Sequence, residues 1–499
     1  MHHMRVLFFS LCLGFTFCAF AQTNATYKEQ YRPRFHFSPA INWCNDPNGL
    51  VYFNGEYHLF YQHNPFGNIW GHMTWAHAVS KDLVHWKHLP IAIAEEKEIM
   101  IFSGTCVIDK NNTSGFGKSG KAPMVAVYTG HIENVNQSQH LAYSLDNGIT
   151  WTKYNKNPVL DLGKKDFRDP KIFWYQPKEY WVMALMFPVE HFVQFYSSKN
   201  LKDWNHLSDF GPAGDSSGVW ECPDLTQVPI EGMPGEKKWV LQTSQNASMQ
   251  YFVGEFNGTI FTNENPTNKI ARPDYGPDYY AAIAYNQLPA AILPTAIGWL
   301  NNWNYANDIP TTPWKGAMSL PRTLSVKKIN DEWLLLQKPA AVLQSLRTKI
   351  LELKNATINE IKLLPVKSQQ FEMEIVFEPS ALSTSGVRIA KAGNSFFEIG
   401  YDATNQLLYI DRSKAGFRSF NKIFEKLNRF ETPLVLNNKP LQLHIFFDHS
   451  IVEVFANNGE AVLTAQIFPE EADNGIELFS SGGKSALIKA TIWNIRSIW

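Results

Sequence analysis

One turn pattern occurs three times in this chain: SKDLVHW (80–86), SLDNGITW (144–151) and SKNLKDW (198–204). Each copy has a serine, then an aspartate or asparagine, then a tryptophan, and follows a short run of aromatic and β-branched residues typical of a strand. Such a turn, recurring at ~50 to 65 residues among short strands, predicts successive blades of a β-propeller. Chance similarity in a chain with 16 tryptophans is the alternative.

The rest of the chain indicates a second all-β domain. A length of 499 residues exceeds the ~250 to 300 at which a single core stops growing. Residues 339–353 carry four apolar side chains at helical spacing, which predicts an amphipathic helix. About eight strand-like segments follow it and predict a β-sandwich. The expected organisation is a signal peptide at 1–21, a β-propeller domain at 22–337, a helical linker at 338–354 and a β-sandwich at 355–499.

The N-terminus has the features of an export signal. Arg5 precedes a short apolar run at 6–20, and Ala19-Phe20-Ala21 resembles a signal cleavage site before Gln22. A membrane anchor is the alternative, but the run is shorter than the ~20 residues of a spanning helix. We therefore expect a secreted or periplasmic protein, cut after Ala21, with no membrane span in the mature chain.

The net charge narrows the classes of ligand, and the cysteine content limits the possible disulfides. Lys and Arg total 45 against 46 Asp and Glu, so a formal net charge of -1 gives no reason to expect nucleic acid, and a neutral substrate fits better. Cys12 and Cys18 leave with the signal peptide. The remaining Cys44, Cys106 and Cys222 are too few and too far apart for a disulfide framework, and at least one thiol stays unpaired within the chain.

Three acids stand one or two residues before a proline: Asp46, Asp169 and Glu221. A residue directly before proline is pushed into extended geometry, so Asp46 and Asp169 are expected at strand ends. Taken singly, each acid is more often a turn or cap residue. Together they suggest glycoside hydrolysis, in which one carboxylate attacks the sugar and another carboxyl protonates the leaving oxygen.

Sequence neighbours suggest different roles for the three acids. Asp46 lies among asparagines whose amides favour a charged carboxylate, as a nucleophile requires. Glu221 follows Trp220, and an apolar neighbour raises a carboxyl pKa, which suits a general acid/base. Asp169 stands beside Arg168, whose guanidinium favours an anion that grips sugar hydroxyls.

Four motifs, in this order along the chain, resemble the signature motifs of glycoside hydrolase family 32, the invertases, inulinases and levanases: NDPNG (45–49), FSG (102–104), RDP (168–170) and ECP (221–223). The resemblance extends to residues 298–318 and, in the second domain, to SIVEVF (450–455) and GEA (459–461). It therefore covers nearly all of the mature chain. Several motifs in fixed order are far more specific than any one of them.

The resemblance implies a five-bladed β-propeller with a C-terminal β-sandwich, and a retaining exo-hydrolase that releases terminal fructose. By motif match Asp46 is the nucleophile, Glu221 the acid/base and Asp169 the transition-state stabiliser. No cofactor and no metal are implied. The positions that match the family's fructosyl pocket are Asn45, Gln62, Trp70, Phe102, Ser103 and Arg168.

The segment 298–308 combines tryptophans with amides, which suits stacking and hydrogen bonding to a furanose. Its aromatic residues could equally be core residues of the last blade. We expect a substrate role for one of its tryptophans, Trp299 or Trp303. The segment looks more like the exo-inulinases and levanases than like sucrose invertases.

Two further features, Cys44 and a group of histidines, lie in the first blade. Cys44 stands where the family usually has methionine, so we expect altered packing beneath the nucleophile rather than lost chemistry. Six histidines crowd the first blade, but their spacing matches no helical zinc motif, and ordinary strand or turn histidines are expected. They are His58, His63, His72, His77, His85 and His88.

These observations predict an exported exo-β-fructosidase acting on terminal β-D-fructofuranosyl units of levan or inulin, with sucrose a lesser substrate. Three alternatives stay open: a fructosyltransferase using the same site, a non-catalytic fructan-binding protein, and a pentose-polymer hydrolase on a similar propeller. The sequence predicts neither the preferred linkage nor the oligomeric state. The sandwich is expected to stabilise the propeller more than to bind polymer.

Overall fold

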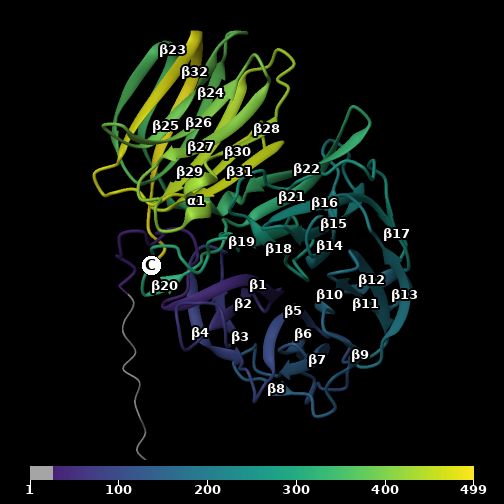
Figure 1. Ribbon diagram of the computed structural model, residues 1–499. Helices are drawn as coiled ribbons and strands as arrows, with labels where there is room; N and C mark the ends of the chain where they lie inside the picture. The colour runs from purple at the N-terminus through teal and green to yellow at the C-terminus, as the bar shows by residue number, and fades with distance from the viewer. Residues whose placement is uncertain (1–25) are drawn as a thin grey trace, which may run out of the picture.

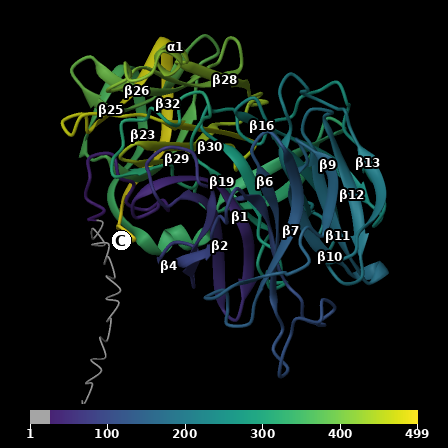
Figure 2. The same cartoon turned by 60° about the horizontal axis from the view of Figure 1, so that its bottom comes forward.

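The computed structural model describes residues 26–499 and divides them between a propeller and a sandwich (Figures 1 and 2). Five sheets surround one axis in Figure 1, and the sandwich packs against one side of this ring. The predicted all-β fold, a five-bladed β-propeller followed by a C-terminal β-sandwich, is confirmed. The predicted signal peptide, with Cys12 and Cys18, lies outside the described residues.

Each blade is an antiparallel sheet whose first strand lies nearest the axis. Blade 1 is β1 to β4 with the short parallel β20, blade 2 is β5 to β9, blade 3 is β10 to β13, blade 4 is β14 to β17, and blade 5 is β18, β19, β21 and β22. The bounds are β1 Asn42–Phe53, β2 Glu56–Asn64, β3 Thr74–Ser80, β4 Trp86–Ile93, β5 Met100–Ile108, β6 Met124–Ile132, β7 Asn136–Ser144, β8 Thr152–Lys153, β9 Leu160–Lys164, β10 Arg168–Tyr175, the 3-10 helix η1 Gln176–Lys178, β11 Tyr180–Phe187, β12 Phe192–Ser198, β13 Asn205–Phe210, β14 Glu221–Pro229, β15 Lys237–Gln245, β16 Ser248–Phe256, β17 Phe261–Asn263, β18 Tyr280–Ala284, β19 Thr295–Trp299, β20 Trp314–Lys315, β21 Arg322–Ile329 and β22 Glu332–Pro339.

The repeated turn is the corner between the third and fourth strands of blades 1, 2 and 3. Its third residue is Asp82, Asp146 or Asn200, and the side-chain oxygen accepts backbone hydrogen bonds from residues two to four positions later. For example, the Val84 N–H donates to Asp82 Oδ1 at 3.1 Å. Short polar side chains stabilise turns in this way, which explains why the pattern could be recognised without any structure.

The predicted helix at 339–353 is wrong over most of its length. Ala341–Leu346 forms a short 3-10 helix, η2, which buries Leu343 and Leu346, and the 21-residue strand β23 (Arg347–Lys367) follows at once. β23 pairs with the last strand of the chain over nearly its whole length. This partner supplies the backbone hydrogen bonds, so tertiary pairing overrides the helical spacing.

The sandwich is built around its last strand, β32, whose first part pairs with β25 and whose second part pairs with β24. One long strand therefore contributes to both layers, and the buried faces enclose an aliphatic and aromatic core. The remaining bounds are β24 Gln370–Glu378, β25 Thr384–Ala392, β26 Ser395–Asp402, β27 Leu407–Lys414, α1 Lys422–Lys426, β28 Arg429–Pro433, β29 Leu441–Asp448, β30 Ile451–Ala456, β31 Ala461–Gln466 and β32 Gly475–Ile495.

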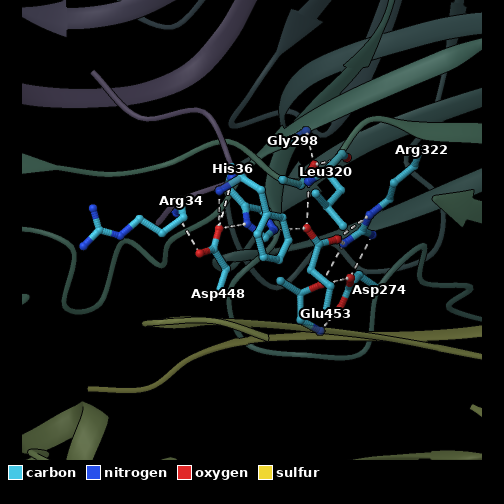
Figure 3. A network of polar contacts seen from close by, with 11 residues as sticks. Arg34, His36, Asp274, Gly298, Leu320, Arg322, Asp448 and Glu453 are labelled. Carbon is cyan, nitrogen blue, oxygen red and sulfur yellow. Dashed lines mark hydrogen bonds and ion pairs between the residues drawn. The ribbon is translucent and has the colours of Figure 1, made fainter. Parts of the chain in front are cut away.

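A buried network of charges joins the two domains (Figure 3). His36 Nδ1 lies 2.8 Å from Asp448 Oδ2, and its Nε2 lies 3.0 Å from Glu453 Oε1. Arg322 places Nη2 2.6 Å from Glu453 Oε2 and Nη1 2.9 Å from Asp274 Oδ2. Asp448 and Glu453 come from the sandwich and the other three from the propeller side. Buried charges are tolerated when they are paired, so this network fixes the two domains in one arrangement.

Within residues 26–499, no helix is long and apolar enough to cross a membrane. Cys44, Cys106 and Cys222 are all buried and free. The Cys44 thiol packs in the core of blade 1 beneath the start of β1, close to Gly316. A Cβ atom at Gly316 would lie 2.1 Å from the Cys44 carbonyl oxygen, so the motif at 313–318 needs glycine where it passes under Cys44.

Candidate active site

The inner strand of every blade has a register shift near its N-terminal end. In β5, β10, β14 and β18 two residues oppose one residue of the neighbouring strand, which is a β-bulge, and in β1 Asp46 is the extra residue. Bulges turn side chains out of the regular pleat and are common beside active sites. Because these five strands lie next to one another around the axis (Figure 1), their bulged residues converge.

The three predicted acids meet at this point around Cys222. The Cys222 Sγ lies 3.7 Å from Asp46 Oδ2 and 3.7 Å from Asp169 Oδ2, and the Cys222 backbone N–H donates to Asp169 Oδ2 at 2.9 Å. Glu221 is the residue directly before Cys222. The structure therefore brings together carboxyl groups from blades 1, 3 and 4.

Removal from water dominates the electrostatics of two of the acids. Burial raises the pKa of Asp46 to about 6, and the charge of Glu221 adds to the rise. Burial also raises the pKa of Asp169 to about 7, although the Arg168 guanidinium lowers it. The Asn45 amide and the Arg168 guanidinium favour the charged forms of Asp46 and Asp169, as their sequence positions predict, but burial outweighs them and raises both pKa values.

Glu221 differs from the other acids in exposure and partners. Its side chain is 24% exposed, whereas Asp46 and Asp169 are buried. Arg168 Nε donates to Glu221 Oε1 at 3.2 Å, and the Tyr280 hydroxyl donates to Oε2 at 2.5 Å. Trp220, expected to shield Glu221, instead packs into the core between blades 3 and 4. Tyr280 was not predicted, and the one signal for it is its place just before the bulge of blade 5.

Two side chains that were not predicted hold Arg168 in place. Arg168 Nη1 donates to Gln137 Oε1 at 3.1 Å and to Asp166 Oδ1 at 2.8 Å. The neighbouring acid is fixed through its backbone, since the Asp169 N–H donates to Thr129 Oγ1 at 3.0 Å. Gln137 and Thr129 belong to blade 2, so the RDP motif depends on the preceding blade. No local pattern in the sequence marks these partners.

The polar residues predicted to bind substrate surround Asp46. The Ser103 hydroxyl donates to Asp46 Oδ2 at 2.9 Å, and Asn45 Oδ1 accepts from the Trp43 indole at 2.8 Å. Gln62 lies opposite Asn45 in the neighbouring strand. Among the described residues, Asp46 Oδ1 and Gln62 Nε2 are buried and have no hydrogen-bond partner. A polar ligand would satisfy such atoms.

The predicted aromatic residues form the wall and rim of the site. The Phe102 ring stacks on His131 at a centroid distance of 4.2 Å and meets the edge of Trp70 at 6.1 Å. Trp70 is 38% exposed, so it lies at the rim. Gly104, next to the bulge, allows this wall to form, because a Cβ atom there would lie 2.2 Å from the Val127 carbonyl oxygen.

The two tryptophans of the last blade differ in accessibility. Trp299 is fully buried, whereas Trp303 is half-buried. Their ring centroids lie 4.6 Å apart, and Trp303 also stacks on Trp43 at 6.1 Å. Trp303 is therefore the better placed of the two to meet a ligand, with Trp299 behind it.

Each of the six histidines of blade 1 hydrogen-bonds another protein group. His58 and His77 pair with each other at 3.0 Å, His72 lies against Glu95, and His85 lies against Asp82. His63 bonds the Trp43 carbonyl oxygen and His88 bonds the Tyr27 hydroxyl. Each has the environment of a strand or turn histidine.

A cleft of about 1020 Å³ lies away from the three acids, between blades 4 and 5 and the sandwich. Asparagines, lysines and Trp333 line it. The bulged inner strands do not contribute to it. The three converging carboxyl groups, and not the size of a cavity, therefore mark the candidate active site.

Two family models and several known proteins match most of the chain. The model of the glycosyl hydrolases family 32 N-terminal domain matches residues 36–339, and that of the family 32 C-terminal domain matches residues 342–494. The chain is 44% identical to a levanase of Bacillus subtilis over 99% of this chain and 75% of that protein. It is 39% identical to an extracellular exo-inulinase of Aspergillus niger, over 95% of this chain and 96% of the other.

The fold has the same relatives. The crystal structure of an exo-inulinase from Aspergillus awamori superposes with a TM-score of 0.88 at 37% identity, covering 95% of this chain and all of that one. A fructofuranosidase from Schwanniomyces occidentalis, solved with fructose, gives a TM-score of 0.86 at 31% identity and covers 94% of this chain and 99% of that one. Both domains are therefore shared with these structures.

Proposed function

Since this chain belongs to glycoside hydrolase family 32, we propose that it is an exported, retaining exo-β-fructosidase. Its substrates are the terminal non-reducing β-D-fructofuranosyl residues of levan or inulin, and sucrose is a lesser substrate. The convergence of three carboxyl groups around Cys222 carries the proposal. The names of the relatives, levanase and extracellular exo-inulinase, support the substrate class and export.

The first step of the proposed reaction is attack by Asp46 on the anomeric carbon of the terminal fructose. A carboxylate oxygen of Asp46 forms a bond to this carbon while the bond to the leaving glycosidic oxygen breaks. Glu221 transfers its proton to that oxygen, so the rest of the sugar chain leaves as a neutral alcohol. Asp46 is ionised above about pH 6, which fits attack near neutrality.

In the second step Glu221 takes a proton from water, and the water oxygen displaces Asp46 to release fructose. The exposure of Glu221 supports this assignment, because the leaving group and the water both arrive from the solvent side. Asp46, at 8% exposure, occupies the inner end of the site, as a nucleophile for a terminal sugar requires.

The remaining residues hold the fructose ring. Asp169 accepts hydrogen bonds from sugar hydroxyls and Arg168 keeps Glu221 oriented. Asn45 and Gln62 offer buried polar atoms to further hydroxyls. Trp303 supplies an aromatic face against the ring.

Initial rates of fructose release from levan, inulin and sucrose test the proposal. Fructose as the sole early product from the polymers indicates exo-cleavage, and an initial β-anomer seen by NMR indicates retention. Asp46→Ala should abolish release while far-UV and near-UV circular dichroism stay unchanged. Transfer of fructose to sugar at high sucrose would favour a fructosyltransferase, and the absence of any release by wild-type protein would refute the proposal.

A further inference from the structure

Arg412 of the sandwich is buried in the interface with the propeller, with 1% exposure. Its guanidinium donates to Asp278 Oδ2 at 3.1 Å and to the Tyr305 hydroxyl at 3.2 Å, and it stacks on the Phe424 ring at 3.8 Å. The Tyr305 hydroxyl in turn donates to Asp278 Oδ1 at 2.7 Å. One sandwich side chain thus bonds two buried propeller residues that also bond each other.

Tyr305 belongs to the segment 300–311, which the sandwich holds at two more places. Gln466 Nε2 donates to the Leu300 carbonyl oxygen at 3.0 Å, and Asn421 Nδ2 donates to Asp308 Oδ2 at 2.6 Å. Within the segment, Asn302 Nδ2 donates to the Pro277 carbonyl oxygen at 2.7 Å, next to Asp278. The start, middle and end of the segment are therefore fixed from outside the propeller.

The same segment forms one wall of the candidate active site. Trp303 stacks on Trp43, whose indole holds Asn45 beside the nucleophile. Asn307 Oδ1 accepts from the backbone N–H of Trp70 at 2.9 Å. A shift of segment 300–311 would therefore move both the inner aromatic wall and the rim.

We propose that the sandwich domain takes part in substrate binding through Arg412, a positioning residue that holds segment 300–311 in its binding geometry. The inference rests on the proposed function, since segment 300–311 is taken as part of the fructosyl pocket. Arg412 itself touches no substrate. A planar guanidinium suits the role, because its fork reaches Asp278 and Tyr305 together, which an ammonium group does not.

The test separates positioning from plain stabilisation. Tyr305→Phe keeps the ring and removes only the hydroxyl, Arg412→Met removes the guanidinium, and Arg412→Lys keeps the charge. His36→Gln is the matched control, because it also weakens a buried interdomain ion pair but contacts nothing in segment 300–311. KM and kcat for sucrose and inulin are measured at a temperature where every variant is folded.

Positioning predicts that Arg412→Met raises KM by about tenfold and Tyr305→Phe by about threefold, the effect of one or two hydrogen bonds. Arg412→Lys should lie between wild type and Arg412→Met, and His36→Gln should lower the melting temperature while KM stays unchanged. Wild-type KM in both Arg412→Met and Tyr305→Phe would overturn the inference. So would an equal rise in KM in His36→Gln.

Further variants and a spectroscopic measurement test the inference where the main comparison fails. If Arg412→Met does not fold, Tyr305→Phe and the surface variant Asn421→Ala still alter the hold on the segment and carry the same expectation. If the wild type releases no fructose, the proposed function fails, and near-UV circular dichroism still tests the inference. The near-UV circular dichroism signal that is lost in Trp303→Phe is the contribution of the Trp303 ring. Arg412→Met should change this part of the spectrum, and His36→Gln should leave it unchanged.

Discussion

Replacing His36 with glutamine should remove a pH-dependent part of the stability of this protein. Burial alone lowers the pKa of His36, but the hydrogen bonds and charges of Asp448 and Glu453 outweigh it and raise the pKa to about 9. The imidazole is therefore protonated in the folded chain at neutral pH, between two buried carboxylates (Figure 3). In the unfolded chain it has its ordinary pKa of 6.5.

The size and sign of the effect follow from these two values. A group whose pKa is raised on folding stabilises the folded state fully below its unfolded pKa and loses that contribution as the pH rises through its folded pKa. The rise from 6.5 to about 9 corresponds to about 3 kcal/mol, at about 1.4 kcal/mol per unit. The stabilisation is thus complete below about pH 6.5 and gone above about pH 9.

Urea denaturation of wild type and His36→Gln at several pH values measures this contribution. The difference in apparent unfolding free energy should shrink by about 3 kcal/mol between about pH 6 and pH 10. Lysine and tyrosine titrations affect both proteins and cancel in the difference. His449→Gln is the control, because burial lowers the pKa of that neighbouring histidine, so its effect on the unfolding free energy lies at and below its ordinary pKa of 6.5 and not toward pH 9. A difference that stays constant from pH 6 to 10 would refute the reasoning.

Three further predictions concern the active site. Hydrolysis should decline as the pH falls through about 6, because Asp46 is then protonated; a kcat/KM profile that stays level to about pH 4 would contradict this. Ser103→Ala should lower kcat by about tenfold and move the acidic limb of the pH profile to higher pH, because the wild-type hydroxyl donates a hydrogen bond that lowers the pKa of Asp46. Ser103→Thr keeps the hydroxyl and should keep most of the activity. Asp46→Asn should abolish turnover. It should also raise the unfolding free energy at about pH 8 by up to about 3 kcal/mol, because the buried carboxylate charge of the wild type disfavours folding. In thermal melts this gain should shrink toward about pH 4, where the wild-type carboxyl is protonated.

The features that the sequence predicted well are those stabilised by their own neighbours. The blade corners were found because Asp82 and its counterparts bond backbone groups a few residues away. The three acids were singled out because each stands one or two residues before a proline, and Pro170 and Pro223 lie in bulges where no ladder hydrogen bond is needed. Such local chemistry leaves a pattern in the chain.

The features that were missed depend on partners distant in sequence. Residues 339–353 have helical spacing, but β32, at the far end of the chain, supplies strand partners for residues 347–353. Asp46 has polar neighbours in sequence, yet burial among five blades decides its pKa. Tyr280 bonds Glu221 from the next blade and has no motif of its own. These partners lie too far away along the chain for a local sequence pattern to reveal them.

The bulges also explain why the catalytic geometry is a property of neighbouring blades rather than of single motifs. Asp169 and Cys222 have φ values of 65° and 50°, a left-handed conformation that costs a non-glycine residue of order 1–3 kcal/mol. Each is held by the blade before it: the Asp169 N–H donates to Thr129 Oγ1, and the Cys222 N–H donates to Asp169 Oδ2. Asp169 therefore supports the bulge next to Glu221 as well as facing the site. Because the same carboxylate does both, the position of Glu221, the proposed acid/base, is tied to the residue that we expect to bind the sugar hydroxyls.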